Sequence, residues 1–70
     1  MGFKIRSEVT GSVCQVLVAD GAKVSDGDVL LLVEAMKMEI PLESPRAGVC
    51  RLLVAQGDSV AEGDPVAEID

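Results

Sequence analysis

A lysine between two methionines occupies the middle of this 70-residue chain, at residues 34–39, Glu-Ala-Met-Lys-Met-Glu. Lysine is most often a solvated surface residue and methionine most often fills gaps in a core. The common interpretation of such a lysine is therefore a surface residue without a function of its own. However, the run from Val29 to Leu42 contains no Gly, Asn or Asp, the residues that make a two-residue hairpin easy. A chain reversal at Met36-Lys37 would depart from that turn chemistry, and such departures are often functional sites. The pattern indicates a primary amine that is held out to be modified.

Catalysis by the chain itself is not expected. The sequence has no histidine, which removes the commonest general base, the serine and cysteine triads and most zinc sites. Cys14 and Cys50 remain, and in the absence of a secretory signal we expect both thiols to be reduced. A thiolate nucleophile needs a cationic neighbour, so we expect two packing residues rather than catalytic groups. No catalytic residue and no metal site is predicted.

The composition indicates a folded domain with an acidic surface. The formal net charge is −6, Phe3 is the one aromatic residue, and no stretch clusters Lys and Arg. Neither nucleic acid nor an anionic membrane is therefore an expected partner. No apolar run is long enough to span a bilayer, and residues 1–10 hold no apolar segment of a secretory signal. We expect one domain over residues 1–70, in the cytoplasm, that is monomeric in isolation.

The second half of the chain repeats the first at a spacing of 36 residues. Nine positions are identical between residues 13–34 and 49–70, among them Gly27 and Gly63. Glycine tolerates positive φ, so the shared glycines predict matching tight turns. A repeat of this kind predicts two structurally similar halves.

The same alignment makes two finer predictions. Cys14 aligns with Cys50, so the two thiols are predicted to be equivalent members of the repeat. Gly48 falls one position away from the counterpart of Gly11, so the turn that enters the second copy is expected to differ from that of the first.

Short apolar runs separated by turn dipeptides predict an all-β chain. The predicted strands cover residues 4–7, 13–19, 29–34, 38–42, 49–55 and 65–69, with short extended segments around Val24 and Val60. Each half exposes an apolar face that only the other half can cover. We therefore predict two small sheets packed face to face about an approximate two-fold axis. Pro41 lacks a backbone N–H and is expected at a sheet edge.

The string at residues 34–39 resembles the attachment motif of biotin carboxyl carrier domains, whose central residues are Ala-Met-Lys-Met. The resemblance covers nearly the whole chain, including the turn segments 20–28 and 56–64 and the Met-Glu-Ile-Pro segment at 38–41. It looks most like the short, single-domain biotin/lipoyl attachment proteins and the carrier subunits of acyl-CoA carboxylases. It implies a flattened β-barrel of two four-stranded antiparallel sheets, with the lysine at a hairpin and both termini at the opposite end. Because the two halves match without a gap, we expect no protruding thumb.

By this resemblance Lys37 is the residue that receives biotin as a covalent cofactor, and Ala35, Met36 and Met38 are its recognition context. A biotin protein ligase would attach the biotin. The carrier would then move carboxyl groups from a biotin carboxylase to a carboxyltransferase, commonly onto an acyl-CoA, as in the acetyl-CoA carboxylase of fatty acid biosynthesis. We also expect Met36 to be partly packed and Met38 to be more exposed.

Two other functions stay open at the level of sequence. One is a lipoyl carrier on the same fold, although lipoyl domains usually have Asp before the lysine and Ala or a β-branched residue after it, and Lys37 has methionine on both sides. The other is an unmodified interaction module of the same architecture. The carboxyl acceptor also stays open, as does whether the chain is a free-standing protein or part of a larger one.

Overall fold

The computed structural model describes residues 2–70, and every regular element in that range is a β-strand. The strands are β1 (Phe3–Arg6), β2 (Gly11–Val16), β3 (Lys23–Val24), β4 (Val29–Ala35), β5 (Met38–Glu43), β6 (Gly48–Leu52), β7 (Ser59–Val60) and β8 (Pro65–Ile69). This confirms the all-β prediction. The described residues include no helix that is long and apolar enough to cross a membrane.

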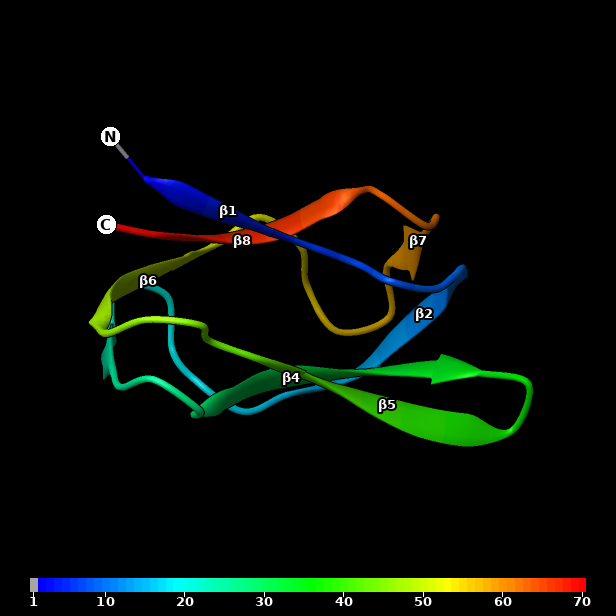
Figure 1. Ribbon diagram of the computed structural model, residues 1–70. Coiled ribbons are helices and arrows are strands. Elements are labelled where there is room, and N and C mark those ends of the chain that lie inside the picture. The colour runs from blue at the N-terminus through cyan, green and yellow to red at the C-terminus, as the bar shows by residue number, and fades with distance from the viewer. Residues whose placement is uncertain (1) are drawn as a thin grey trace.

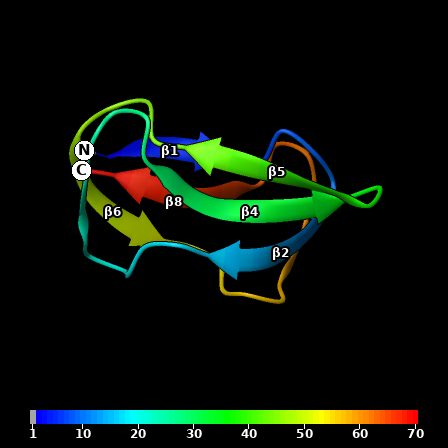
Figure 2. The ribbon, with the colours of Figure 1, turned by 90° about the horizontal axis from the view of Figure 1, so that it is seen from below.

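The strands form two four-stranded antiparallel sheets that face each other (Figure 1). One sheet has the strand order β1-β8-β6-β3, and the other has the order β5-β4-β2-β7. In the view from below, β4 and β5 lie over β8 and β1 (Figure 2). The buried hydrophobic side chains form one core, which consists of Ile5, Val13, Val24, Leu30, Leu31, Val33, Leu42, Cys50, Val60, Val66, Ala67 and Ile69. The predicted flattened barrel of two sheets is confirmed.

Matching hydrogen bonds in the two halves confirm the approximate two-fold relationship. Gly27 N donates to Ser44 O at 2.8 Å, and Gly63 N donates to Ser7 O at 2.8 Å. The two glycines have φ of 92° and 91°, a region that side chains disfavour. A Cβ at either position would meet no atom within 4 Å, so the requirement for glycine there comes from the backbone conformation and not from crowding.

A β-bulge makes the register of the two halves unequal. In the β2–β4 ladder Val13 pairs with Val33, but the next pair is Gln15 with Leu32. Cys14 is therefore an extra residue in β2 without a partner of its own. The ladder between β6 and β8 shows no such shift. The first half thus contains one residue more than the second within this strand.

Because of the bulge, Cys50 is the counterpart of Val13 and not of Cys14. Gly57 N donates to Val13 O and Gly21 N donates to Cys50 O, each at 2.7 Å. The predicted equivalence of the two cysteines is wrong, because a constant spacing of 36 residues does not allow for the inserted residue. Cys50 is buried in the core, whereas Cys14 is half-buried at the bulge.

Ahead of the bulge the spacing between the halves is 37 residues. Gly11 and Gly48, which begin β2 and β6, are therefore counterparts, and the expected difference between the entry turns is wrong. Ser7 and Ser44 are counterparts as well, with exposed fractions of 2% and 1%. Each hydroxyl donates to the carbonyl oxygen two residues further along the chain, which satisfies a buried polar group locally.

Two predicted strands end earlier than expected, at Val16 and Leu52. The cause is that residues 17–22 carry the chain from the sheet of β2 to the sheet of β3, and residues 53–58 carry it from the sheet of β6 to that of β7. The two crossings have the same length, so neither forms a thumb.

The long outer strands β1 and β5 carry different edge-protecting residues. Pro41 lies on the edge strand β5, as predicted, paired only with Leu32 of β4. Its counterpart on β1, at the spacing of 37, is Lys4. Proline removes a backbone N–H donor from the open edge, and lysine places a positive charge there. Both discourage the edge strand from pairing with another chain.

Candidate functional site

The β4–β5 hairpin closes in a two-residue turn at Met36-Lys37. Ala35 pairs with Met38 in the last rung of the ladder. Met36 has a φ of 51° and Lys37 a φ of 64°. Positive φ at both central residues is the pattern of a type I′ turn, whose twist matches that of the flanking strands. The reversal predicted at Met36-Lys37 is confirmed.

Neither turn residue is of the type that this backbone prefers. Type I′ turns favour Asn-Gly, because a left-handed conformation costs an ordinary residue about 1 kcal/mol or more. Met36 and Lys37 are the only non-glycine residues with positive φ within residues 2–70. Asn or Gly would suit this backbone conformation better than Met36 and Lys37. We therefore infer that these two residues occur here because of what their side chains do, and not because of the turn they form.

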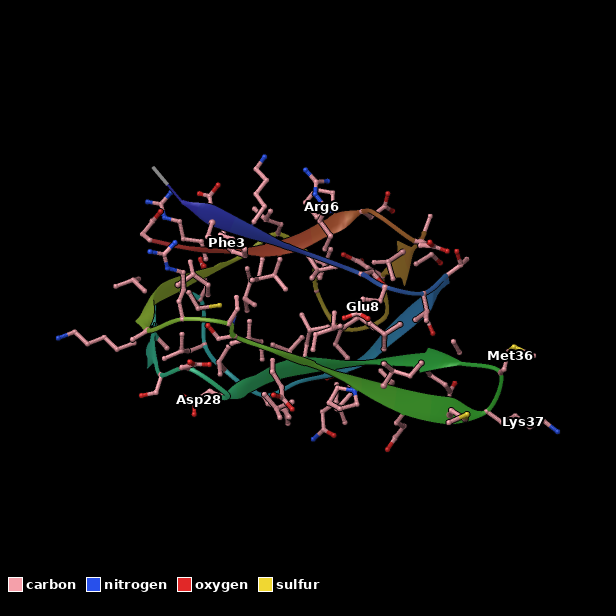
Figure 3. All side chains as sticks on the ribbon, viewed as in Figure 1. Phe3, Arg6, Glu8, Asp28, Met36 and Lys37 are labelled. Carbon is pink, nitrogen blue, oxygen red and sulfur yellow. The ribbon has the colours of Figure 1, made fainter. Side chains whose placement is uncertain are left out.

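The side chains of Met36 and Lys37 project from one end of the molecule (Figure 3). Met36 is 95% exposed, Met38 is 64% exposed, and Lys37 is exposed as well. The expectation that Met36 would be the more packed of the two methionines is wrong. Met36 is a central turn residue with no strand beside it, whereas Met38 shares a face of β5 with Ile40 and Leu42, which point toward the core.

Two carboxylates flank the base of the turn. Glu34 and Glu39 are directly opposite each other in the β4–β5 ladder, and both are exposed. Within residues 2–70 no carboxylate lies within ion-pairing distance of Lys37, and the ion pair that is formed joins Arg51 Nε to Asp70 Oδ2 at 3.1 Å. The Lys37 amine is therefore not held by any carboxylate of the described chain.

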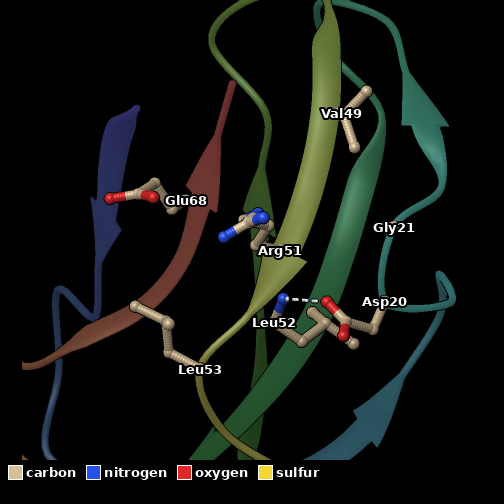
Figure 4. A pocket seen from close by; sticks show the side chains of 7 residues that line it. All are labelled: Asp20, Gly21, Val49, Arg51, Leu52, Leu53 and Glu68. Carbon is tan, nitrogen blue, oxygen red and sulfur yellow. Dashed lines mark hydrogen bonds between the residues drawn. The ribbon is translucent and has the colours of Figure 1, made fainter. Parts of the chain in front are cut away.

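The hairpin lies at the opposite end of the molecule from both termini (Figure 1). An open hollow lies elsewhere, beside β6 (Figure 4), where Leu52 N donates to Asp20 Oδ1 at 2.9 Å. None of its lining residues belongs to the β4–β5 hairpin; they are Asp20, Gly21, Val49, Arg51, Leu52, Leu53 and Glu68. Lys37 therefore lies on a projecting turn and not in this hollow.

The cysteines do not contribute reactive groups to the hairpin. Burial, and to a lesser extent the negative charge of Asp20, raises the pKa of the Cys50 thiol, which favours its neutral form. Cys14 Sγ donates to Leu32 O at 3.4 Å. Both observations agree with packing residues. The part of the chain that the structure describes contains no cluster of three or more His, Cys, Asp or Glu residues placed to hold a metal ion.

One residue near the hairpin was not singled out by sequence reasoning. Gly11 lies against the end of β4, and a Cβ placed there would be 2.1 Å from Glu34 O and 3.2 Å from Ala35 Cβ. The sequence carries a signal for it, because Gly11 and Gly48 begin corresponding strands. That signal becomes visible only when the bulge at Cys14 is allowed for in the alignment.

Comparisons with known proteins point to one family. The sequence model described as "Biotin-requiring enzyme" matches residues 4–69. The chain is 45% identical over 49 residues to a protein named "Biotinylated protein TB7.3 homolog" from Mycobacterium leprae, and the match covers 70% of this chain and 69% of that protein.

Two solved structures share the fold. The urea carboxylase of Kluyveromyces lactis matches 100% of this chain with a TM-score of 0.92 and 34% identity. A single-chain, multi-domain long-chain acyl-CoA carboxylase matches 97% of it with a TM-score of 0.87 and 33% identity. This chain corresponds to only 6% and 7%, respectively, of those two long chains.

Proposed function

The chain belongs to the biotin/lipoyl attachment family, and we propose that it is a biotin carboxyl carrier in which Lys37 is the biotinylated residue. Its cofactor is biotin, bound covalently, and it acts as a carrier rather than as a catalyst. The assignment of Lys37 rests on one observation above all. It is an exposed lysine at the tip of a hairpin, in a backbone conformation that lysine ordinarily avoids.

The residues at the tip fit covalent attachment. An amide bond to Lys37 forms when its Nζ, as the free amine, attacks the activated carboxyl carbon of biotin. The C–N bond forms, the adenylate group leaves as AMP, and the amine gives up a proton. A biotin protein ligase supplies the activation and the proton acceptor, since nothing around Lys37 in the described chain is arranged as a general base. The chain contributes an unhindered nucleophile.

The two methionines give the ligase and the carboxylase enzymes an apolar surface to contact. Met36 and Met38 are among the most exposed large hydrophobic side chains, and unbranched thioether side chains adapt to different partner surfaces. Ala35 is half-buried and pairs with Met38 in the last rung of the ladder before the turn. When it is bound, biotin supplies a ring nitrogen that accepts and releases a carboxyl group.

The carrier is proposed to act between a biotin carboxylase and a carboxyltransferase. Structural similarity to segments of a urea carboxylase and of a long-chain acyl-CoA carboxylase supports this arrangement. We propose an acyl-CoA carboxylase system as the setting, with residues 1–70 acting as one monomeric carrier domain in the cytoplasm. The absence of a thumb from the first half is consistent with a small carrier that contacts its enzymes through the hairpin tip.

Incubation of the purified chain with a biotin protein ligase, ATP and biotin tests the proposal. Intact mass and an avidin blot should show one biotinyl group per chain in the wild type and none in Lys37→Arg, which keeps the positive charge. Parallel reactions with a lipoate ligase, ATP and lipoate should give no product. Modification by lipoate alone would assign the chain to the lipoyl carriers, and no modification by either ligase would indicate an unmodified interaction module.

A further inference from the structure

Gly11 of β2 lies against the end of β4, at the base of the hairpin. A Cβ at this position would lie 2.1 Å from Glu34 O, 3.0 Å from Glu34 C and 3.2 Å from Ala35 Cβ. Non-bonded distances below 3.0 Å are essentially never found for a real Cβ, so a larger residue at position 11 requires β2 or the end of β4 to shift. Because the atom in the way is a backbone carbonyl, rotation of a flexible side chain does not relieve the clash.

The end of β4 leads directly into the turn. Toward the tip, the last pair between β2 and β4 is Ser12 with Glu34, and beyond it β4 pairs only with β5. The tip from Ala35 to Met38 therefore projects past its last support from the other strands, as Figure 1 shows for the β4–β5 hairpin. A shift of Glu34 and Ala35 is transmitted to the lysine through the two-residue turn that follows them.

We propose that Gly11 is a positioning residue for biotinylation. Without a side chain it lets β2 approach the Glu34 carbonyl, and this close contact fixes the direction in which the hairpin presents Lys37 to the ligase. The inference rests on the proposed function of Lys37. It adds a residue that lies 26 positions before the lysine in the sequence, outside the attachment motif, and that does not itself contact the reacting atoms.

The two-fold relationship supplies a matched control at the opposite end of the molecule. Gly48 is the counterpart of Gly11, and a Cβ there would lie 2.3 Å from Asp70 O and 2.7 Å from Ile69 Cγ2. Substitution of either glycine by alanine therefore creates a similar backbone clash. Only the clash at Gly11 lies at the base of the lysine hairpin, whereas the clash at Gly48 lies by the chain terminus.

The experiment compares biotinylation kinetics of the wild type, Gly11→Ala and Gly48→Ala with one ligase. Folded fractions are measured by circular dichroism at 10 °C, with trimethylamine N-oxide added where a variant is partly unfolded. Rates are expressed per folded molecule. We expect Gly11→Ala to lower kcat by about tenfold to a hundredfold with a smaller change in KM, because a misplaced amine still binds but reacts slowly. Gly48→Ala should react within twofold of the wild type.

Amide chemical shifts give a second readout that does not involve the ligase. The resonances of Met36, Lys37 and Met38 should move in Gly11→Ala and stay in place in Gly48→Ala. Equal kinetics for the two variants per folded molecule, or unmoved tip resonances in Gly11→Ala, would overturn the proposal. So would a Gly11→Ala chain that remains unfolded in the osmolyte, because the glycine would then serve the fold as a whole. If the wild type itself is not labelled, the assignment of Lys37 fails instead.

Discussion

Val13 and Cys50 occupy corresponding positions in the two halves of the barrel. Both are buried, with exposed fractions of 1% and 0%, and each carbonyl accepts a 2.7 Å hydrogen bond from a turn glycine. One half therefore fills this core position with an aliphatic side chain and the other with a thiol. Because the other half holds valine at this position, the substitution Cys50→Val is a natural test of the thiol.

Cys50→Val should still fold, at a cost of about 1 to 3 kcal/mol, because it adds one heavy atom at a fully buried position that holds valine in the other half. The variant should also change the pH dependence of stability. Burial raises the pKa of Cys50 in the fold, so the unfolded thiol loses its proton first as the pH rises. Above about pH 8.5, the ordinary thiol pKa, the unfolded state is favoured and the wild type loses stability.

Urea unfolding at pH 7 and pH 10 measures this difference. The wild type should lose more stability between the two pH values than Cys50→Val. An identical decline in the wild type and in Cys50→Val would show that the buried thiol is not coupled to unfolding.

Met36→Asn should stabilise the fold and impair labelling. Asparagine tolerates the left-handed conformation at the first central position of a type I′ turn better than methionine does. We expect a gain of about 0.5 to 1 kcal/mol, which for a domain of this size raises Tm by roughly 3 to 8 °C. Thermal unfolding measures the gain, and ligase kinetics should show a slower reaction because one exposed apolar contact is lost.

Met38→Asn is the matched control for the turn. Met38 lies in β5, where φ is not positive, so the same substitution offers no relief of the backbone. It should leave Tm unchanged or lower it. A stabilisation of equal size in both variants would mean that removal of an exposed methionine, and not the turn conformation, raises the stability.

Gly27→Ala and Gly63→Ala should each destabilise the fold by about 1 kcal/mol or more, through the backbone conformation alone. The two costs should be similar, because the glycines have φ of 92° and 91° in corresponding turns and neither Cβ would meet a neighbour. Chemical denaturation measures the costs. Labelling per folded molecule should equal that of the wild type, and a selective loss of labelling would indicate that these turns also shape the hairpin.

The sequence predicted those features that depend on local residue types. Gly27 and Gly63 were predicted as turns because only glycine adopts their φ without cost, and Pro41 was placed at an edge because it cannot donate to an inner ladder. The glycine and proline predictions are confirmed because the physical reason in each case lies within one or two residues. The hairpin at Met36-Lys37 was instead implied by the resemblance to biotin carboxyl carrier domains.

The features that the sequence did not reveal depend on contacts between distant segments. The bulge at Cys14 arises from how β2 pairs with β4, and identical residue types at Cys14 and Cys50 concealed it. The close contact of Gly11 with Glu34 requires the three-dimensional path of two strands. The exposure of Met36 depends on how far the hairpin projects beyond the body, which composition and spacing do not specify.

Lys37→Ala should leave the fold unchanged to within about 0.5 kcal/mol while it abolishes labelling. The lysine is exposed, forms no ion pair within the described chain, and alanine faces the same backbone conformation as lysine at this position. Denaturation and an avidin blot of the same preparation check both halves of the prediction. If the variant unfolds, Lys37 has a structural role in the turn.

Tryptic mapping of the labelled wild-type chain tests the assignment of Lys37 most directly. Trypsin cleaves after lysine and arginine, but not after a lysine whose amine is acylated. Biotin on Lys37 therefore predicts one peptide that runs uncut from Val24 to Arg46 and gains one biotinyl group. Cleavage after Lys37, with biotin on Lys4 or Lys23 or on no lysine, would contradict the assignment.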